Sequence, residues 1–387
     1  MTRCQSGLAS LLLVAGIARP LFGQAEKPPQ PALDPELPYQ ARRSNPVTYE
    51  VDFSVVVTAP EGTKLLRVWL PIPPSDQGQE VRDRELSTFP LKVTPQLATE
   101  PVYGNRFAYF EFVRPRGAQI IRHKFRVTVW ELHWDVDPDK VVRITDWPKG
   151  FDKYLRGEPE AVVLDERVRK LLGEIVPARE GPARDMTAIM AWVHRTMTYD
   201  HTAASLRAST RHALDHKRGH CSDFHSVCAA FGRALNSPTR VVYGINPFPK
   251  NSPSHCKLEV YLPPYGWVSF DVSETHRLMA AIRADANLDG RRKERLLKAA
   301  AERLARGYRD NTWYLQTKGT DYELAPPARQ RVPVVRTIYA EADGEPLPDP
   351  DPANPAQREF GWMTVHQYVP DRPVTYPFAD WRSLEKE

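Results

Sequence analysis

The chain has 387 residues, of which 41% are hydrophobic and 26% are charged, and its formal net charge at pH 7 is +5. This length and apolar content suffice for two or three folded domains and exclude an intrinsically disordered chain. The basic residues are dispersed among acidic ones and form no bank with stacking aromatic residues, so the composition does not indicate nucleic-acid binding.

The N-terminus has the features of a secretory signal peptide. Arg3 precedes an apolar run from Leu8 to Ala18, which is too short to span a bilayer comfortably. Gly23-Gln24-Ala25 offers a small-x-small cleavage site, so we expect residues 1–25 to be removed. The mature protein is then secreted or periplasmic, with no stable membrane insertion. An uncleaved membrane anchor is the structural alternative.

The next two regions differ sharply in composition. Residues 26–44 are rich in proline and polar residues and predict a solvated linker. Residues 45–140 predict short alternating strands at 49–57, 65–70, 91–94, 107–113 and 120–132. Turn signals such as Pro60-Glu61-Gly62 separate them. This pattern favours an antiparallel β-sandwich without a catalytic constellation.

From about residue 141 the pattern changes to mixed helices and strands. We expect helices at 165–175 and 183–197, a further helix after residue 220, and strands at 240–244, 255–262 and 267–271. Residues 141–280 therefore predict an α+β core. Residues 281–387 form a C-terminal extension that we expect to pack on this core, with a helix at 291–306 and strands at 321–324, 334–340 and 363–368.

Cys221 is the first candidate for chemistry. Apolar residues recur at helical spacing from Phe224 to Leu235, and Gly219 permits a sharp entry into that helix. The cysteine is thus expected at the helix N-terminus, where unpaired N–H groups and the helix dipole stabilise a thiolate. The thiolate is the nucleophilic form of cysteine, so this position favours a catalytic role over simple packing.

His255 and Asp271 are expected on the two strands of a hairpin. The alternation after His255 predicts one strand, Pro263-Pro264-Tyr265-Gly266 the turn, and Trp267 to Asp271 the second strand. A residue near the start of the first strand faces one near the end of the second, so Asp271 can orient the His255 ring. Together with Cys221 they form a predicted catalytic triad. A turn residue is the plainer interpretation of Asp271.

The same segments resemble the transglutaminase-like superfamily, which has a papain-like Cys-His-Asp core. The resemblance rests on Gly-x-Cys-x-Asp-Phe-His at 219–225, on Ser-Pro-Thr-Arg followed by Tyr-Gly at 237–244, on His-Cys at 255–256 and on Gly-Trp-Val-x-x-Asp at 266–271. It implies Cys221 as nucleophile, His255 as general base and then acid, and Asp271 as the residue that holds the imidazole. It also implies a β-sandwich before the core, as in many bacterial relatives.

Lys257 departs from the family pattern, which often has an aromatic residue two positions after the histidine. Alternation places its side chain on the same face as His255. We therefore expect it to line the cleft and to favour acidic substrates.

The mature chain keeps three cysteines, Cys221, Cys228 and Cys256. Cys228 is expected to be a packing residue on the helix. Cys256 should point away from the nucleophile, on the face of its strand opposite to His255. The sequence does not decide whether Cys228 and Cys256 form a disulfide.

A metal site is the alternative for this region, because four possible ligands cluster in the sequence: His216, His220, Cys221 and His225. Their spacing matches no recognised ligand pattern, so neither a metal nor another cofactor is predicted. Asp223 and His225 are expected instead to fix the start of the helix and its packing.

The sequence thus predicts a transglutaminase-like cysteine enzyme that acts on peptide or glutamine amide bonds of a protein or peptide substrate. The reaction passes through a thioester intermediate on the cysteine. The acyl group passes to water or to an amine, and the residues do not choose between these outcomes. The alternative is a non-catalytic envelope protein that keeps this fold to bind a peptide or protein partner.

Overall fold

The computed structural model describes Met1 and residues 33–248, 253–354 and 361–385. The predicted signal peptide after Met1 lies outside the described residues. From Ala32 onward the chain forms one compact unit. In the described part of the chain, every helix is too short or too polar to cross a lipid bilayer.

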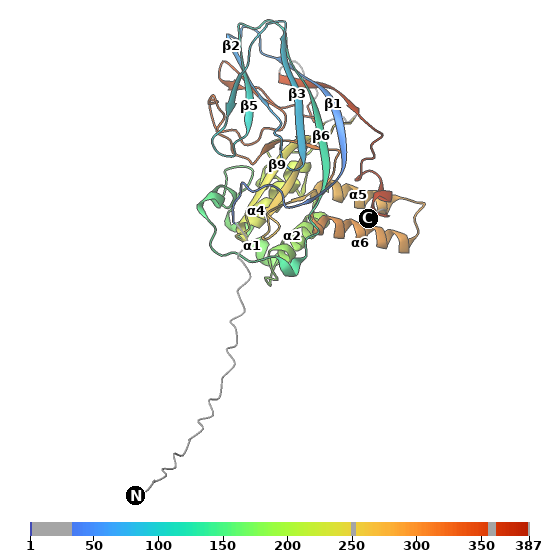
Figure 1. Cartoon of the computed structure of the whole chain (residues 1–387). Coiled ribbons are helices and arrows are strands. Elements are labelled where there is room, and N and C mark those ends of the chain that lie inside the picture. The colour runs from blue at the N-terminus through green and yellow to red at the C-terminus, as the bar shows by residue number, and fades with distance from the viewer. Residues whose placement is uncertain (2–32, 249–252, 355–360, 386–387) are drawn as a thin grey trace. The chain divides into compact units, whose positions relative to one another are not determined.

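Two antiparallel sheets face each other in the part of the molecule drawn at the top of Figure 1. The first has the order β12-β6-β1-β16, with β3 also paired to β6. Its strands are β1 (Arg42–Thr58), β3 (Gln79–Phe89), β6 (Ala118–His133), β12 (Tyr308–Arg309) and β16 (Gly361–Pro370).

The second sheet has the order β15-β14-β2-β5-β4. Its strands are β2 (Leu65–Pro71), β4 (Gln96–Thr99), β5 (Arg106–Val113), β14 (Tyr339–Ala342) and β15 (Glu345–Pro346). Alternate residues of both sheets, such as Val55 and Phe53 on β1 and Val68 on β2, enter one buried cluster between them. This alternation is the period-2 pattern that the sequence predicted for a β-sandwich.

The strand predictions for this region were only partly right. The strand expected at 91–94 is absent, and β3 at Gln79–Phe89 was not predicted. Most of β3 is at least partly exposed, so its sequence lacks the apolar alternation that reveals a half-buried strand.

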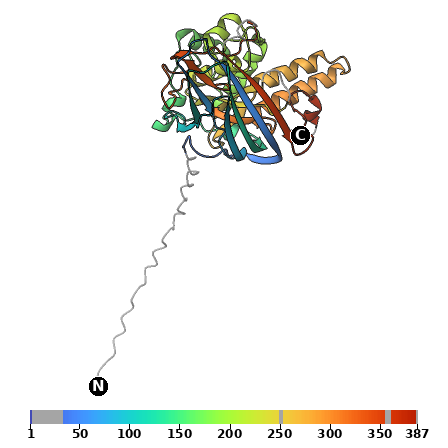
Figure 2. The same cartoon turned by 90° about the horizontal axis from the view of Figure 1, so that it is seen from above.

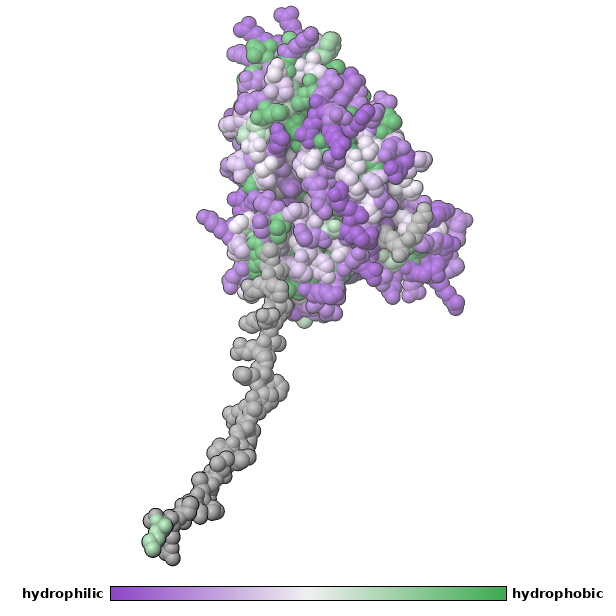
Figure 3. Space-filling view, in the orientation of Figure 1, coloured by the Kyte–Doolittle hydropathy of each residue, from purple (hydrophilic) through white to green (hydrophobic). Residues whose placement is uncertain are grey.

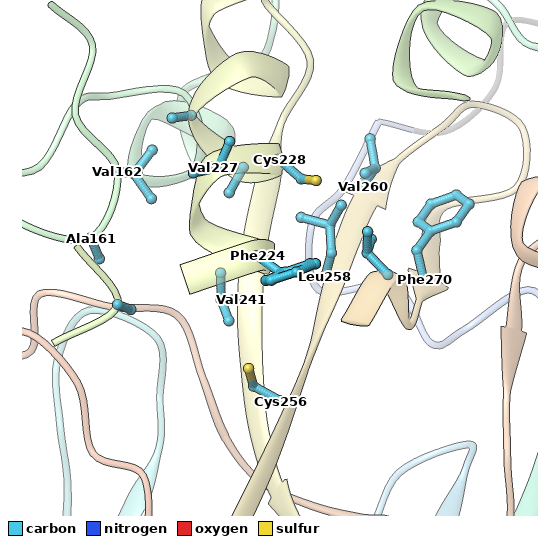
Figure 4. Close-up of a cluster of buried hydrophobic side chains, with 14 of the residues drawn as sticks. Ala161, Val162, Phe224, Val227, Cys228, Val241, Cys256, Leu258, Val260 and Phe270 are labelled. Atoms are coloured by element: carbon cyan, nitrogen blue, oxygen red, sulfur yellow. The ribbon is translucent and has the colours of Figure 1, made fainter. Parts of the chain in front are cut away.

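The core combines a four-stranded sheet with helices. The sheet has the order β11-β10-β9-β13, and its strands are β9 (Thr239–Ile245), β10 (Ser254–Tyr261), β11 (Trp267–Phe270) and β13 (Tyr314–Lys318). Helix α4 (Cys221–Ala234) packs on this sheet, where Phe224 and Cys228 meet Leu258 and Val260 (Figure 4).

Helices also cover the other side of α4, so nearly all of its residues are buried. They are α1 (Glu166–Ile175), α2 (Pro182–Thr196) and α3 (Thr210–His216). The short parallel pair β7 (Thr198–Tyr199) and β8 (Arg218–Gly219) leads into α4. Three 3-10 turns complete the described structure, η1 (Pro138–Lys140), η2 (Lys149–Tyr154) and η4 (Trp381–Glu385).

Helices α5 (Val272–Ala284) and α6 (Gly290–Arg306) form a hairpin that extends to one side of the strands (Figure 2). The face of this hairpin seen in Figure 3 is covered mainly by hydrophilic residues. Helix α6 agrees with the predicted helix at 291–306. Helix α5 was not predicted, although Asp271 and Glu274 form the Asp-x-x-Glu signature of a helix start.

The C-terminal extension had been expected to pack on the core, but it also contributes strands to the sheets. It supplies β13 to the core sheet, β14 and β15 to one sandwich sheet, and β12 and β16 to the other. The strands expected at 321–324 and 334–340 shrink to an isolated Tyr322–Val332 bridge and to β14. Pairing with the distant strand β2 determines where β14 forms, and the sequence of the segment itself does not encode this pairing.

Gly244 is a position where only glycine fits, because an added Cβ would lie 2.1 Å from the backbone oxygen of Tyr314. We expect Gly244→Ala to lower the free energy of unfolding by about 1–3 kcal/mol or more in urea titrations. Gly173 in α1 has no atom within 4 Å of an added Cβ. The control Gly173→Ala should instead stabilise the protein by about 0.5–1 kcal/mol. Equal effects of the two substitutions would contradict this account of the sheet.

Candidate active site

The turn into α4 is fixed by a close backbone contact and a capping box. A Cβ on Gly219 would lie 2.5 Å from Asp223 Oδ2, so the chain passes here only without a side chain. Asp223 Oδ2 accepts the backbone N–H of His220 at 3.0 Å, and the carboxylate also bonds to Ser205. These contacts make Cys221 the first residue of α4, as predicted.

Cys221 is nearly buried, with 8% of its surface exposed. A hydrogen bond from the Cys256 thiol is the main influence that holds the pKa of Cys221 well below its ordinary value, while burial acts in the opposite direction. A hydrogen bond with His255 and the charge of His220 lower this pKa further. The arrangement therefore favours the thiolate, the nucleophilic form of cysteine.

His255 lies at the start of β10 and is bonded on one side of its ring to Asp271. Its Nε2 is 2.8 Å from Asp271 Oδ2, so Nδ1 is the ring nitrogen left for the hydrogen bond with Cys221. Burial lowers the pKa of His255, but the charge and hydrogen bond of Asp271 outweigh it and raise the pKa to about 9. The imidazole is thus protonated at neutral pH.

Asp271 has two tasks at the junction of β11 and α5. Its Oδ1 accepts the backbone N–H of Glu274 at 3.1 Å and caps α5, while Oδ2 bonds to His255. Burial alone would raise the pKa of Asp271, but the charges of His255 and Lys257 hold it well below its ordinary value. The structure thus brings Cys221, His255 and Asp271 together.

The expectation that Lys257 lines a cleft was wrong. None of its surface is exposed, and its Nζ lies 2.6 Å from Asp271 Oδ2 and 2.8 Å from Asp310 Oδ2. Alternation did place Lys257 on the face of His255. The rings of Trp313 and Phe378, from far along the chain, cover that face at this point.

Cys256 also departs from expectation, because its thiol bonds to Cys221 instead of pointing away from it. Helix α4 packs on the face of β10 that carries Cys256 and Leu258 (Figure 4). Cys221, the first residue of this helix, therefore lies on the same side of β10 as the Cys256 thiol. Cys228 lies farther along α4, beside Val260 (Figure 4). None of Cys221, Cys228 and Cys256 forms a disulfide, so the possible Cys228–Cys256 bridge is absent.

Of the four residues considered as metal ligands, Cys221 and His225 both bond to the Cys256 thiol. His216 bonds to the backbone of its own helix, and His220 contacts Ser222. His225 accepts the N–H of Val272 at Nε2. In the described ranges, no three His, Cys, Asp or Glu side chains are arranged to hold a metal ion.

Two carboxylates of this region were missed in the sequence. Glu274 is 1% exposed, lies 3.9 Å from His255 Nδ1 and is paired with Arg277 at 3.0 Å. The Asp-x-x-Glu pattern of Asp271 and Glu274, which marks a helix start, could have revealed Glu274 in the sequence. Asp310 follows the two-residue strand β12 and belongs to no motif, so only the folded chain reveals its contact with Lys257.

A model of a known protein family matches the segment that carries Cys221, His255 and Asp271. The family model of the transglutaminase-like superfamily matches residues 169–272, which contain all three residues of the predicted triad. The chain carries a transglutaminase-like core.

One solved structure shares the fold over most of the chain. A candidate cysteine protease from Cytophaga hutchinsonii is 14% identical and aligns with a TM-score of 0.60 over 87% of this chain and 95% of that one. The periplasmic domain of TgpA from Pseudomonas aeruginosa is 16% identical and aligns with a TM-score of 0.32 over 58% of this chain and 89% of that one.

A curated relative matches in sequence. An uncharacterised protein of Haemophilus influenzae is 23% identical over 229 residues, which are 52% of this chain. The match spans 59% of that protein, less than two thirds of its length.

The raised pKa of His255 predicts a pH dependence of stability. The folded state holds this proton up to about pH 9, whereas an unfolded histidine releases it near pH 6.5, at about its ordinary pKa. Its stabilisation is therefore complete below about pH 6.5 and is lost as the pH rises to the folded pKa. Urea titrations should show this loss in the wild type and not in His255→Gln. The same pH dependence in both proteins would contradict the assignment.

Proposed function

We propose that this protein is an exported cysteine hydrolase that cleaves peptide or glutamine amide bonds through a thioester on Cys221. The observation that supports this most strongly is the hydrogen-bonded series of Cys221, His255 and Asp271. A nucleophile at a helix start, a base beside it and a carboxylate that orients the base are the parts that thiol acyl transfer requires.

In the first half of the reaction the thiolate of Cys221 attacks the carbonyl carbon of the amide. A C–S bond forms and the carbonyl oxygen takes up negative charge. Backbone N–H groups at the start of α4 are the donors proposed for this oxyanion, each worth about 3 kcal/mol where such donors have been tested. His255, which holds a proton up to about pH 9, protonates the leaving nitrogen as the C–N bond breaks.

In the second half His255, now neutral, takes a proton from water. The resulting nucleophile attacks the thioester, the C–S bond breaks, and the proton returns to the cysteine–histidine pair. The products are a carboxylic acid and an amine. The same thioester would pass to a primary amine if one replaced water, and the product would then be a new amide.

Hydrolysis is the outcome we prefer, because the solved structure with the same fold is a candidate cysteine protease. Cys221 supplies the nucleophile, His255 acts as acid and base, and Asp271 orients His255, so the proposal needs no cofactor. We further propose that the signal peptide is removed after Ala25 and that the enzyme acts on a protein or peptide in the periplasm or outside the cell.

Alkylation of the mature protein by iodoacetamide, quantified by peptide mass spectrometry across pH, tests the activated thiol without a known substrate. We expect Cys221 to react rapidly well below pH 8.5, about the ordinary thiol pKa, because its thiolate is stabilised. Cys228 and Cys256 are internal controls, since burial raises the pKa of both thiols. In His255→Ala the advantage of Cys221 should disappear.

Turnover is then followed by mass spectrometry of a peptide library that contains glutamine, with Cys221→Ala as the matched control. We expect cleaved or deamidated peptides from the wild type only, with a loss of at least about 10³-fold in the variant. Slow alkylation of Cys221, together with peptide binding that survives Cys221→Ala, would favour the non-catalytic binding protein instead.

A further inference from the structure

Lys257 is a buried charged group that the proposed mechanism does not use. It is fully buried, so it is not available to contact a substrate. Burying an ammonium group costs several kcal/mol unless opposite charges compensate it. Here the carboxylates of Asp271 and Asp310 lie 2.6 and 2.8 Å from Nζ and provide that compensation. The lysine thus connects the triad to a carboxylate outside it.

Asp310 is itself held in place. Its Oδ1 accepts the backbone N–H of Thr312 at 3.0 Å and also bonds to the Thr312 hydroxyl, which leaves Oδ2 for Lys257. The rings of Trp313 and Phe378 lie 5.3 and 5.4 Å from Nζ and close the space around it. The position of the ammonium group is therefore fixed from several sides.

The two oxygens of Asp271 have separate partners. Oδ1 accepts the N–H of Glu274, and Oδ2 is shared by His255 at 2.8 Å and Lys257 at 2.6 Å. Rotation of this carboxylate would break all three contacts. Asp310 lies close enough to repel Asp271 electrostatically, and Lys257 stands between them.

We infer that Lys257 and Asp310 are positioning residues of the proposed reaction, which hold Asp271 ionised and aimed at His255. This inference rests on the proposed function. It extends the triad by two charged residues, one of them supplied by the C-terminal extension. The ammonium group touches neither Cys221 nor a substrate and acts through Asp271.

The titratable groups around Asp271 define what Lys257 contributes. They are His225 on α4, His255, Cys256 and Lys257 on β10, Glu274 on α5, Asp310 after β12, and Tyr376 near the C-terminus. Burial lowers the pKa of His225 to about 4, so this residue is neutral near pH 7. The positive charge beside Asp271 therefore comes from His255 and Lys257, and only that of Lys257 remains when His255 gives up its proton.

The test compares charge-balanced variants. Lys257→Met alone leaves Asp310 without an opposite charge and Asp271 with His255 only, so it is expected to destabilise the core strongly. The double variant Lys257→Met/Asp310→Asn removes one charge of each sign, so it should fold. A matched control is Arg240→Met/Glu259→Gln, which removes another buried ion pair, 2.7 Å apart, on the same sheet without touching Asp271.

The measurement is the alkylation rate of Cys221 against pH in each folded protein. In the double variant Asp271 loses its lysine partner and competes with His255 for the proton at low pH. We expect the acid limb of the profile to move up by about one pH unit, which corresponds to about tenfold slower alkylation at any pH that lies on this limb. The Arg240→Met/Glu259→Gln control should keep the wild-type profile.

The outcomes separate this inference from the proposed function. If wild-type Cys221 reacts no faster than an ordinary thiol, the proposed function fails whatever the variants do. If the wild type reacts fast and the double variant keeps the same acid limb, only the role of Lys257 and Asp310 is refuted. Failure of the double variant to fold also contradicts the inference, because the pair would then be needed for the structure itself.

Discussion

A buried row of alternating charges is the constraint on which the rest of this structure depends. Asp310, Lys257, Asp271 and His255 follow one another at distances of 2.8, 2.6 and 2.8 Å, and each is at most 2% exposed. Any one of them buried alone would cost several kcal/mol, so each is tolerated only because its neighbours are in place. The elements that carry them must meet: β10, the start of α5, and the turn between β12 and β13.

The C-terminal extension closes one side of this row of charges. The last hundred residues supply strands to all three large sheets, and they also bring Asp310, Trp313 and Phe378 to the back of the triad. The opposite side of the sheet is closed by α4, which sets Cys221 above Cys256. Sandwich, core and extension therefore form one compact unit.

The parts of the site that the sequence predicted are those formed by residues close together along the chain. Cys221 could be placed at a helix start from Gly219 and the apolar spacing, and the approach of His255 to Asp271 followed from a hairpin in which the two residues are only 16 positions apart. The burial of Lys257 depends on residues more than 50 positions away, and no local pattern encodes such contacts. The polar strand β3 was not predicted for a related reason. It pairs with β6, but its own residues lack the apolar alternation of a half-buried strand.

The buried carboxylate of Asp271 keeps His255 protonated next to the Cys221 thiolate. Nitrogen NMR of the ¹⁵N-histidine-labelled protein, titrated from pH 5 to pH 10, measures this directly, with His255→Gln used to assign the signal. The account predicts that both ring nitrogens of His255 stay protonated at neutral pH and lose a proton only near pH 9. A His255 that titrates at its ordinary pKa of about 6.5 or below would contradict it.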